Sequence, residues 1–367
     1  GLVAGTLFVL PGVVALLGLS ALYVSAGDSR VVTAAFAGLA PAVLAIIAQA
    51  VVRLGRRALG HPSLVALAAA AFVALAVFGV PFPVVVAGAA AAGWALGVRA
   101  GPGHGGGEDG PAPLIPDDAL HVETPSRGHS LRVLAVGLVA WGIPVTAVLA
   151  LTGRHSVFSD QAFFFSGAAL VTFGGAYAVL AYVAQKAVEV YGWLAPGEMV
   201  RGLALAETTP GPLIMVVQFV AFVGAYRSPG DLNPWVAALV AAGLTTWVTF
   251  VPCFVFVFVG APYVERLRGN QALSAALTGI TAAVVGVIAN LAVFFAVHTL
   301  FGEVHTVSWG PVSLELPDPT SLELVPLATA VVAAVLLFRL HWSVLRTLGV
   351  CAGLGLVGAL VGALTGG

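Results

Sequence analysis

The residues best suited to chemistry in this 367-residue chain lie between positions 171 and 218, in two clusters that break helices. The clusters are Gly174-Gly175 and Thr208-Thr209-Pro210-Gly211-Pro212. Proline frees the carbonyl four residues back, and inside a membrane a freed backbone group is tolerated only where protein or a water-filled cavity satisfies it. A helix that restarts after Pro212 directs its first N–H groups and positive dipole end into such a cavity, which suits an anion. We expect the hydroxyls of Thr208 and Thr209 to cap this helix.

Charged and polar side chains accompany the two clusters. Glu207 comes just before the second cluster, near mid-depth if its helix begins at Pro196, and an ionisable residue inside a span is a functional hypothesis by default. Its carboxylate is a candidate carrier of a coupling proton; the alternative is a pair with Arg201, although a spacing of six residues strains that pair. Arg201 is a candidate contact for an oxyanion or an anchor at the membrane interface. Tyr177 and Gln218 offer polar tips to the same cavity, or else pack.

The composition is that of a membrane protein. Hydrophobic residues make up 60% of the chain and charged residues 8%, against roughly a quarter in soluble domains, which excludes a soluble enzyme. Long unbroken apolar runs also exclude the alternating strands of a β-barrel. The net charge of −1 argues against nucleic acid as a partner. The sequence has no nucleophile elbow, phosphate-binding loop or zinc-ligand spacing, so we expect neither an enzyme nor a metal or cofactor.

The apolar runs predict an all-α polytopic membrane protein with about eleven transmembrane helices, each long enough to cross a bilayer. The expected spans are 2–25, 31–52, 63–80, 82–98, 132–152, 161–186, 199–224, 235–259, 271–298, 324–340 and 343–364. Residues 100–130, rich in Gly, Pro, His, Asp and Glu, form a linker. It separates a first half at 1–99 from a second half at 131–367, which carries one extra helix at 132–152.

Basic residues near the span ends predict the orientation, because cytoplasmic loops carry the excess of Lys and Arg. With eleven spans they fall on one side: Arg53, Arg56, Arg57, Arg99, Arg127, Arg132, Lys186, Arg266, Arg268, Arg339 and Arg346. The acidic loop at 303–323 falls on the opposite side. We therefore expect a multi-pass plasma-membrane protein with its starting terminus and the 100–130 linker in the cytoplasm.

An internal repeat predicts the symmetry of the fold. A shift of 241 residues aligns Pro11 with Pro252 and continues without a gap to Gln49 over Asn290. Span one then corresponds to span eight, seven crossings later, so the two halves face opposite ways. Inverted homologous halves are the architecture of many secondary transporters, with the binding site at their interface. The alternative is chance matching of the small residues that dominate both segments.

Several short stretches resemble the signature of the chromate transporter family. They are FGGAY at 173–177, GW at 192–193, AETTPGP at 206–212 and the following Gln218. The resemblance extends from the start of the chain to about residue 300. It implies a secondary active carrier that exports chromate, a tetrahedral dianion similar in shape to sulfate, with coupling to protons, and that confers chromate resistance.

The two clusters and the family motifs predict one substrate site. Its residues are Phe173, Gly174, Gly175, Tyr177, Arg201, Glu207, Thr208, Thr209, Pro210, Gly211, Pro212 and Gln218. The expected partners are chromate or a similar oxyanion such as sulfate, protons and membrane lipid; a homo-oligomer stays open. In the family each half carries its own copy of both motifs, and the first-half copies would precede Gly1, so the chain resembles a member that lacks its first two helices. The alternatives are a sulfate or other dianion transporter and a non-transporting fragment; a membrane-bound enzyme or sensor would need a soluble domain larger than the linker.

Overall fold

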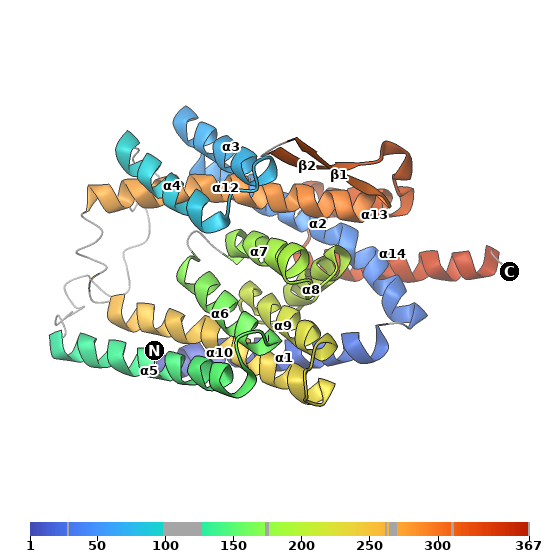
Figure 1. The fold of residues 1–367 in the computed structure, drawn as a ribbon. Coiled ribbons are helices and arrows are strands. Elements are labelled where there is room, and N and C mark those ends of the chain that lie inside the picture. The colour runs from blue at the N-terminus through green and yellow to red at the C-terminus, as the bar shows by residue number, and fades with distance from the viewer. Residues whose placement is uncertain are drawn as a thin grey trace, which may run out of the picture.

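The computed structural model describes residues 1–27, 29–97, 127–172, 176–260, 263, 270–309 and 312–365 (Figure 1). The elements of the first part are α1 (Leu2–Ala26), α2 (Arg30–Ala58), α3 (Pro62–Ala76), α4 (Phe82–Leu96), α5 (Arg127–Thr152), α6 (Val157–Leu170), α7 (Ala176–Gln185) with a π-helical turn at Lys186–Val190, and α8 (Pro196–Thr208). They continue with a 3₁₀ turn at Leu213–Met215, α9 (Val216–Arg227), α10 (Pro234–Gly260), α12 (Gln271–Leu300), β1 (Val304–Trp309), β2 (Val312–Pro317), a 3₁₀ turn at Pro319–Ser321, α13 (Leu324–Ala334) with a π-helical turn at Val335–Arg339, and α14 (Val344–Thr365).

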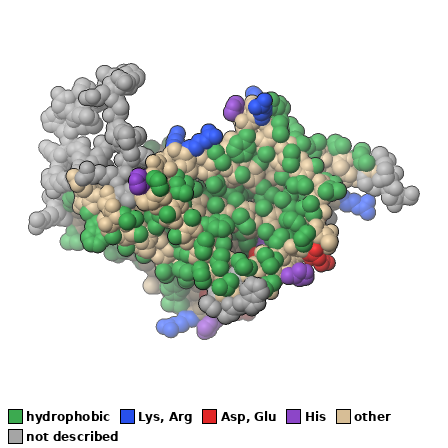
Figure 2. Space-filling view, turned by 90° about the horizontal axis from the view of Figure 1, so that it is seen from above, with side chains coloured by type: hydrophobic (Ala, Val, Ile, Leu, Met, Phe, Trp, Pro, Cys, Tyr) green, Lys and Arg blue, Asp and Glu red, His purple; other side chains and the backbone are tan. Residues whose placement is uncertain are grey.

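The class predicted from composition, an all-α polytopic membrane protein, is confirmed. Among the described residues, six helices are long and apolar enough to cross a membrane: α1, α2, α5, α10, α12 and α14. Hydrophobic side chains predominate on the face shown in Figure 2, and the few charged side chains lie toward its margins. A two-stranded antiparallel β-hairpin is added to the helices, with Val304 opposite Pro317 and Trp309 opposite Val312.

The two ends of the helix bundle differ, and each is named here by what it carries (Figure 1). The linker face is the end at which α4 ends and α5 begins. The β face is the end that carries β1 and β2. The predicted linker at 100–130 lies outside the described residues as far as 126, and α5 already begins at Arg127, so the last four residues assigned to the linker are helical.

The predicted single span at 199–224 is wrong, because this segment forms a re-entrant hairpin. We call this segment hairpin two (Pro196–Arg227), because another hairpin precedes it in the chain. Its two helices, α8 and α9, run antiparallel. Two guanidinium nitrogens of Arg227, in the last turn of α9, each lie 2.6 Å from a carboxylate oxygen of Glu198, in the first turn of α8. Tyr23 of α1 donates a hydrogen bond to the same carboxylate at 2.8 Å. The arms have 13 and 12 residues, about 20 Å each, whereas the hydrocarbon core of a bilayer is about 30 Å thick.

The predicted single span at 161–186 is also wrong. Hairpin one (Val157–Val190) consists of α6, which ends at Leu170, and of α7 with its π-helical turn. Phe164 in the middle of α6 lies 5.3 Å between ring centroids from Tyr182 of α7 and 5.5 Å from Tyr191 beyond the π-helical turn. The chain therefore folds back on itself instead of continuing as one helix.

The two hairpins change the side on which several charges lie. Glu189, at the end of hairpin one, lies within electrostatic reach of Glu315 on β2. Lys186, three residues earlier, therefore lies toward the β face, and its predicted place among the basic residues of the opposite side is wrong. The reason is that a hairpin returns the chain to the face it entered from, whereas a spanning helix does not.

The remaining helices pack across the predicted division between residues 1–99 and 131–367. The α3–α4 pair packs along α12, and the α13–α14 pair packs along α2 (Figure 1). Close backbone approaches in these contacts include Gly279 of α12 against Ala89 and Gly93 of α4, and Gly38 of α2 against Cys351 and Gly355 of α14. In both places the helices meet with almost no side chain between them, which is how small residues stabilise helix pairs in membranes.

The Glu198–Arg227 pair at the base of hairpin two leads to a first prediction. Arg227→Ala removes the cation from this carboxylate, and we expect the free energy of unfolding to fall by about 1 kcal/mol, since the pair is bidentate but half-exposed. Thermal unfolding of the purified protein in detergent measures this as a lower Tm. Arg154→Ala is the matched control, because Arg154 is exposed and forms no ion pair within the described ranges. Equal Tm values for the two variants would contradict the prediction.

Candidate anion site

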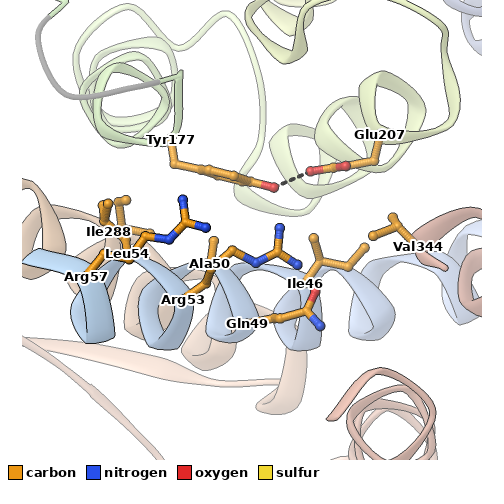
Figure 3. Close-up of a pocket in the computed structure, with 10 residues that line it drawn as sticks. All are labelled: Ile46, Gln49, Ala50, Arg53, Leu54, Arg57, Tyr177, Glu207, Ile288 and Val344. Atoms are coloured by element: carbon orange, nitrogen blue, oxygen red, sulfur yellow. Dashed lines mark hydrogen bonds between the residues drawn. The ribbon is translucent and has the colours of Figure 1, made fainter. Parts of the chain in front are cut away.

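A cavity of about 360 Å³ lies where the two hairpins meet α2 (Figure 3). Its walls come from α2, from the first turn of α7, from the last turn of α8, from α12 and from the start of α14. The lining residues are Ile46, Gln49, Ala50, Arg53, Leu54, Arg57, Tyr177, Glu207, Ile288 and Val344. The site thus joins segments that are far apart in the sequence.

The wall contributed by α2 is cationic. Gln49, Arg53 and Arg57 follow one another at intervals of four residues, so they lie along one face of the helix. Both guanidinium groups point into the space between α2 and the hairpins (Figure 3). Both arginines remain exposed, and neither forms an ion pair with any residue that the structure describes. Guanidinium is a planar set of donors that matches the oxygen atoms of an oxyanion, and two such groups suit a dianion.

The sequence prediction missed Arg53 and Arg57 as site residues. It counted them, together with Arg56, only as charges that orient the protein. The signal that separates them is the spacing: a charge that sets orientation needs no fixed interval, whereas Gln49, Arg53 and Arg57 repeat every four residues. Arg56 breaks this interval and does not line the cavity.

The wall opposite α2 consists of the hairpins. The phenol of Tyr177 donates a hydrogen bond of 2.5 Å to Oε1 of Glu207, which connects the start of α7 to the end of α8 (Figure 3). Both residues were predicted as site residues, and both line the cavity. The alternative prediction for Glu207, a pair with Arg201, is wrong, since Arg201 lies over the ring of Phe36 at 5.8 Å and does not line the cavity.

The threonines of the second cluster do not cap the helix that follows. The hydroxyls of Thr208 and Thr209 donate to the carbonyl oxygens of Leu205 and Ala206, at 2.8 and 2.9 Å. The first turn after Pro212 has no side-chain cap, so the predicted capping is wrong. The physical reason is that α8 ends here and leaves carbonyl groups of its last turn without helical partners, and the hydroxyls satisfy them.

The tip of hairpin two packs against the middle of α1. Pro210 and Gly211 are exposed, and Gly211 has a φ of 128°, a conformation that favours glycine. Its Cα faces the backbone of Gly12 on α1. Pro210, Gly211 and Pro212 shape the turn that ends α8 just beyond Glu207, and they do not themselves line the cavity.

The remaining predicted site residues lie elsewhere or outside the described part. Gln218 is fully buried, donates to the carbonyl oxygen of Val13 at 3.4 Å, and has an Oε1 without a hydrogen-bond partner. Phe173, Gly174 and Gly175 lie outside the described residues. Of the predicted set, the structure therefore brings Tyr177 and Glu207 into the cavity.

A second group of ligand-type side chains lies on the β face. Glu303, His305 and Asp318 place their ligand atoms within 4.8 Å of one another, although the sequence shows no metal-ligand spacing. Glu303 and His305 are exposed. Asp318 accepts hydrogen bonds from the hydroxyl and backbone N–H of Thr320, which hold the pKa of its carboxyl below the usual value. Its carboxylate thus has a structural task in the turn after β2.

The fold and the cavity define a class: a polytopic membrane protein in which two broken helices border a cavity that carries arginine side chains, and secondary transporters bind their substrates at broken helices of this kind. The sequence model of the family described as Chromate transporter matches residues 1–94 and 160–359. The chain therefore belongs to the chromate transporter family. The match continues well past residue 300, where the resemblance judged from motifs ended.

Curated relatives agree with this assignment. The chain is 24% identical over 196 residues to a "Probable chromate transport protein" of Synechococcus elongatus, a match covering 51% of this chain and 47% of the relative. It is 33% identical over 155 residues to a "Chromate transport protein" of Pseudomonas aeruginosa, covering 41% of this chain and 33% of the relative. A "Chromate transport protein" of Cupriavidus metallidurans is 26% identical over 158 residues, covering 43% and 36%. The chain thus spans about half the length, or less, of the curated relatives it matches, and no solved structure matches it with comparable significance.

Proposed function

We propose that this protein is a secondary transporter of chromate and that the cavity between α2 and the two hairpins binds the dianion. The observation that carries the proposal is the pair of arginines, Arg53 and Arg57, which face the cavity without a carboxylate partner among the described residues. A tetrahedral dianion with two oxygens toward each guanidinium satisfies both charges. The names of the relatives support chromate as the cargo.

The proposed mechanism uses Glu207 as the proton carrier. When ionised, its carboxylate repels an anion bound by Arg53 and Arg57; when protonated, it does not. Binding of a proton and binding of the dianion therefore favour each other. Tyr177 holds the Glu207 side chain at the hairpin side of the cavity through its hydrogen bond. This linkage couples the proton to the dianion and does not by itself set the direction of transport. Export, with the linker face in the cytoplasm, is the direction that the family resemblance implies, and the arginines at the end of α2 favour that orientation.

An inverted repeat is part of the proposal, since alternating access needs two halves that exchange roles. The crossed packing supports it. The separation of 241 residues that aligns α1–α2 with α10–α12 pairs Gly38 with Gly279 and Ala34 with Ala275. Their contacts correspond as well: Gly38 lies against Cys351 and Gly279 against Ala89, while Gly355 lies against Ala34 and Gly93 against Ala275. The α1 and α10 helices also run antiparallel, with Gly1 beside Phe258 and Gly5 beside Phe254.

The test of the coupling role is Glu207→Gln, which imitates the protonated carboxyl. We expect the purified variant to bind chromate at neutral pH at least as tightly as the wild type, and its affinity to lose its dependence on pH. In sealed vesicles, a pH gradient should then no longer drive chromate accumulation. Glu323→Gln is the control, since Glu323 is exposed and outside the cavity.

The outcomes separate the parts of the proposal. A Glu207→Gln variant that still accumulates chromate in response to a pH gradient would show that another group carries the proton. Competition by sulfate in the same binding assay measures the selectivity; sulfate affinity well above chromate affinity would change the cargo and leave the site in place.

A further inference from the structure

If α2 and α12 are equivalent helices of an internal repeat, each residue of α2 that lines the cavity has an equivalent residue on α12. With the separation of 241 residues, Gln49 corresponds to Asn290 and Arg57 to His298. The two helices lie antiparallel where they meet, since Gly55 lies near Val285 and Ile288 faces the same cavity as Arg53. Arg57 is therefore displaced from this meeting point toward the linker face, and His298 is displaced from it toward the β face.

The β-hairpin interrupts this correspondence at one place. Over α3–α4 and α13–α14 the separation is 262 residues, as the pairs Ala89 with Cys351 and Gly93 with Gly355 show. The difference of 21 residues falls between α12 and α13, where β1 and β2 lie. The equivalent connection between α2 and α3 has only three residues, 59–61. The second half thus carries an insertion directly after His298.

The surroundings of His298 fix which ring nitrogen is free. Nδ1 lies 2.9 Å from the carbonyl oxygen of Phe294, which can only accept, so Nδ1 carries a hydrogen and donates it. Nε2 lies 3.9 Å from Oε2 of Glu315, on β2 of the insertion. Glu189, at the end of hairpin one, lies within electrostatic reach of both His298 and Glu315, and also of Lys186. The side chain of His298 is 17% exposed, so Nε2 faces Glu315 at a largely covered position.

We propose that His298 is a second anion contact of the carrier, on the β-face side of the meeting point of α2 and α12, and that the β1–β2 insertion covers it through Glu315. The inference rests on the proposed function and adds an access site for the same tetrahedral dianion. The imidazolium form of His298 offers Nε2–H to an oxyanion, as Arg57 does on the other side. The carboxylate of Glu315 competes with the substrate anion for this Nε2–H donor. The anion therefore reaches His298 only when the β-hairpin that carries Glu315 moves away.

The experiment measures chromate uptake into sealed proteoliposomes of known orientation, with chromate added from either face. Glu315→Gln is expected to lower the KM for entry from the β face about fivefold, because a partly exposed charged competitor is removed. His298→Gln is expected to raise the same KM about fivefold, and His298→Arg to restore it. None of the three should change the KM for entry from the linker face. Glu303→Gln, on the same insertion but without contact to His298, is the matched control.

The KM values of these variants distinguish failure of the His298 inference from failure of the proposed function. Unchanged β-face KM values for Glu315→Gln and His298→Gln overturn the inference, as does an equal change from both faces. Arg57→Gln, measured in parallel, tests the proposed function itself: if it weakens binding while the His298 variants behave as wild type, only the further inference fails. If His298→Gln folds poorly, the comparison of Glu315→Gln with Glu303→Gln still decides the question.

Discussion

Replacing Arg53 and Arg57 together by glutamine is expected to abolish chromate binding by the purified protein. Each guanidinium that bonds a charged oxygen contributes about 1.5–3 kcal/mol, so each single variant should weaken binding by about 10- to 100-fold. Glutamine keeps a polar side chain of moderate length, so the loss comes from charge and donor geometry rather than from volume. Isothermal titration with chromate in detergent measures the affinity, and uptake into proteoliposomes measures the transport.

Arg56→Gln is the matched control for this prediction. Arg56 is on the same helix, one residue before Arg57, also exposed and of the same charge, but outside the cavity. If the binding depended only on positive charge at this end of α2, Arg56→Gln would weaken it as much as Arg57→Gln does. Equal losses for the two variants would therefore contradict a site built by the cavity-facing arginines. The salt dependence of the chromate affinity gives a second check. Binding of a dianion by exposed arginines should weaken as the salt concentration rises, because salt screens the charges.

A methyl group at Gly279 is expected to destabilise the protein strongly. The Cβ added by Gly279→Ala would lie 2.7 Å from Cα of Gly93 and would also meet the carbonyl oxygen of Ala89, so it strikes backbone atoms of α4 that have no flexible end to move aside. Overpacking of this kind costs about 1–3 kcal/mol in free energy of unfolding. Thermal unfolding in detergent, followed by tryptophan fluorescence, should show a Tm lower by several degrees.

Two further variants sharpen this result. Gly38→Ala should behave like Gly279→Ala, because its Cβ would meet the backbone of Cys351 and Gly355 in the corresponding contact on α2. Gly88→Ala, on α4, is the control, since a Cβ there meets nothing within 4 Å, and alanine favours a helix over glycine. If Gly279→Ala were as stable as Gly88→Ala, the close approach of α12 and α4 would not exist in solution.

The fold was predictable from the sequence where one stretch of chain decides its own structure. The spans that became α1, α2, α5, α10 and α12 are long apolar runs, and an apolar run of sufficient length has one stable form in a bilayer. The two wrong spans, at 161–186 and 199–224, have the same length and hydropathy as a crossing helix. Hydropathy cannot separate one crossing helix from two antiparallel arms of half the length, because both bury the same side chains. The helix-breaking clusters were recognised, but contacts between distant residues show that the chain turns back: Phe164 with Tyr182 in hairpin one and Glu198 with Arg227 in hairpin two.

The residues of the candidate site also fall into two groups: those that the local sequence predicts and those whose role depends on the packing of distant segments. Glu207 and Tyr177 were predicted because an ionisable group and a family motif stand next to helix breaks, which is visible in the local sequence. Arg53 and Arg57 were not, because their importance comes from the packing of α2 against hairpin tips more than a hundred residues further along the chain. Arg201 has the right chemistry, but α8 turns it toward Phe36 and away from the cavity.

The sequence by itself therefore determined the membrane class, the family and the two places where helices break, since each of these depends on residue types within one segment. The tertiary structure alone decided that the broken helices are re-entrant and which charges face one cavity. The physical reason is that a helix face and a side of the membrane are set by contacts between distant segments, such as Tyr177 with Glu207 and α2 with both hairpins, and those contacts leave no mark in the composition of either partner.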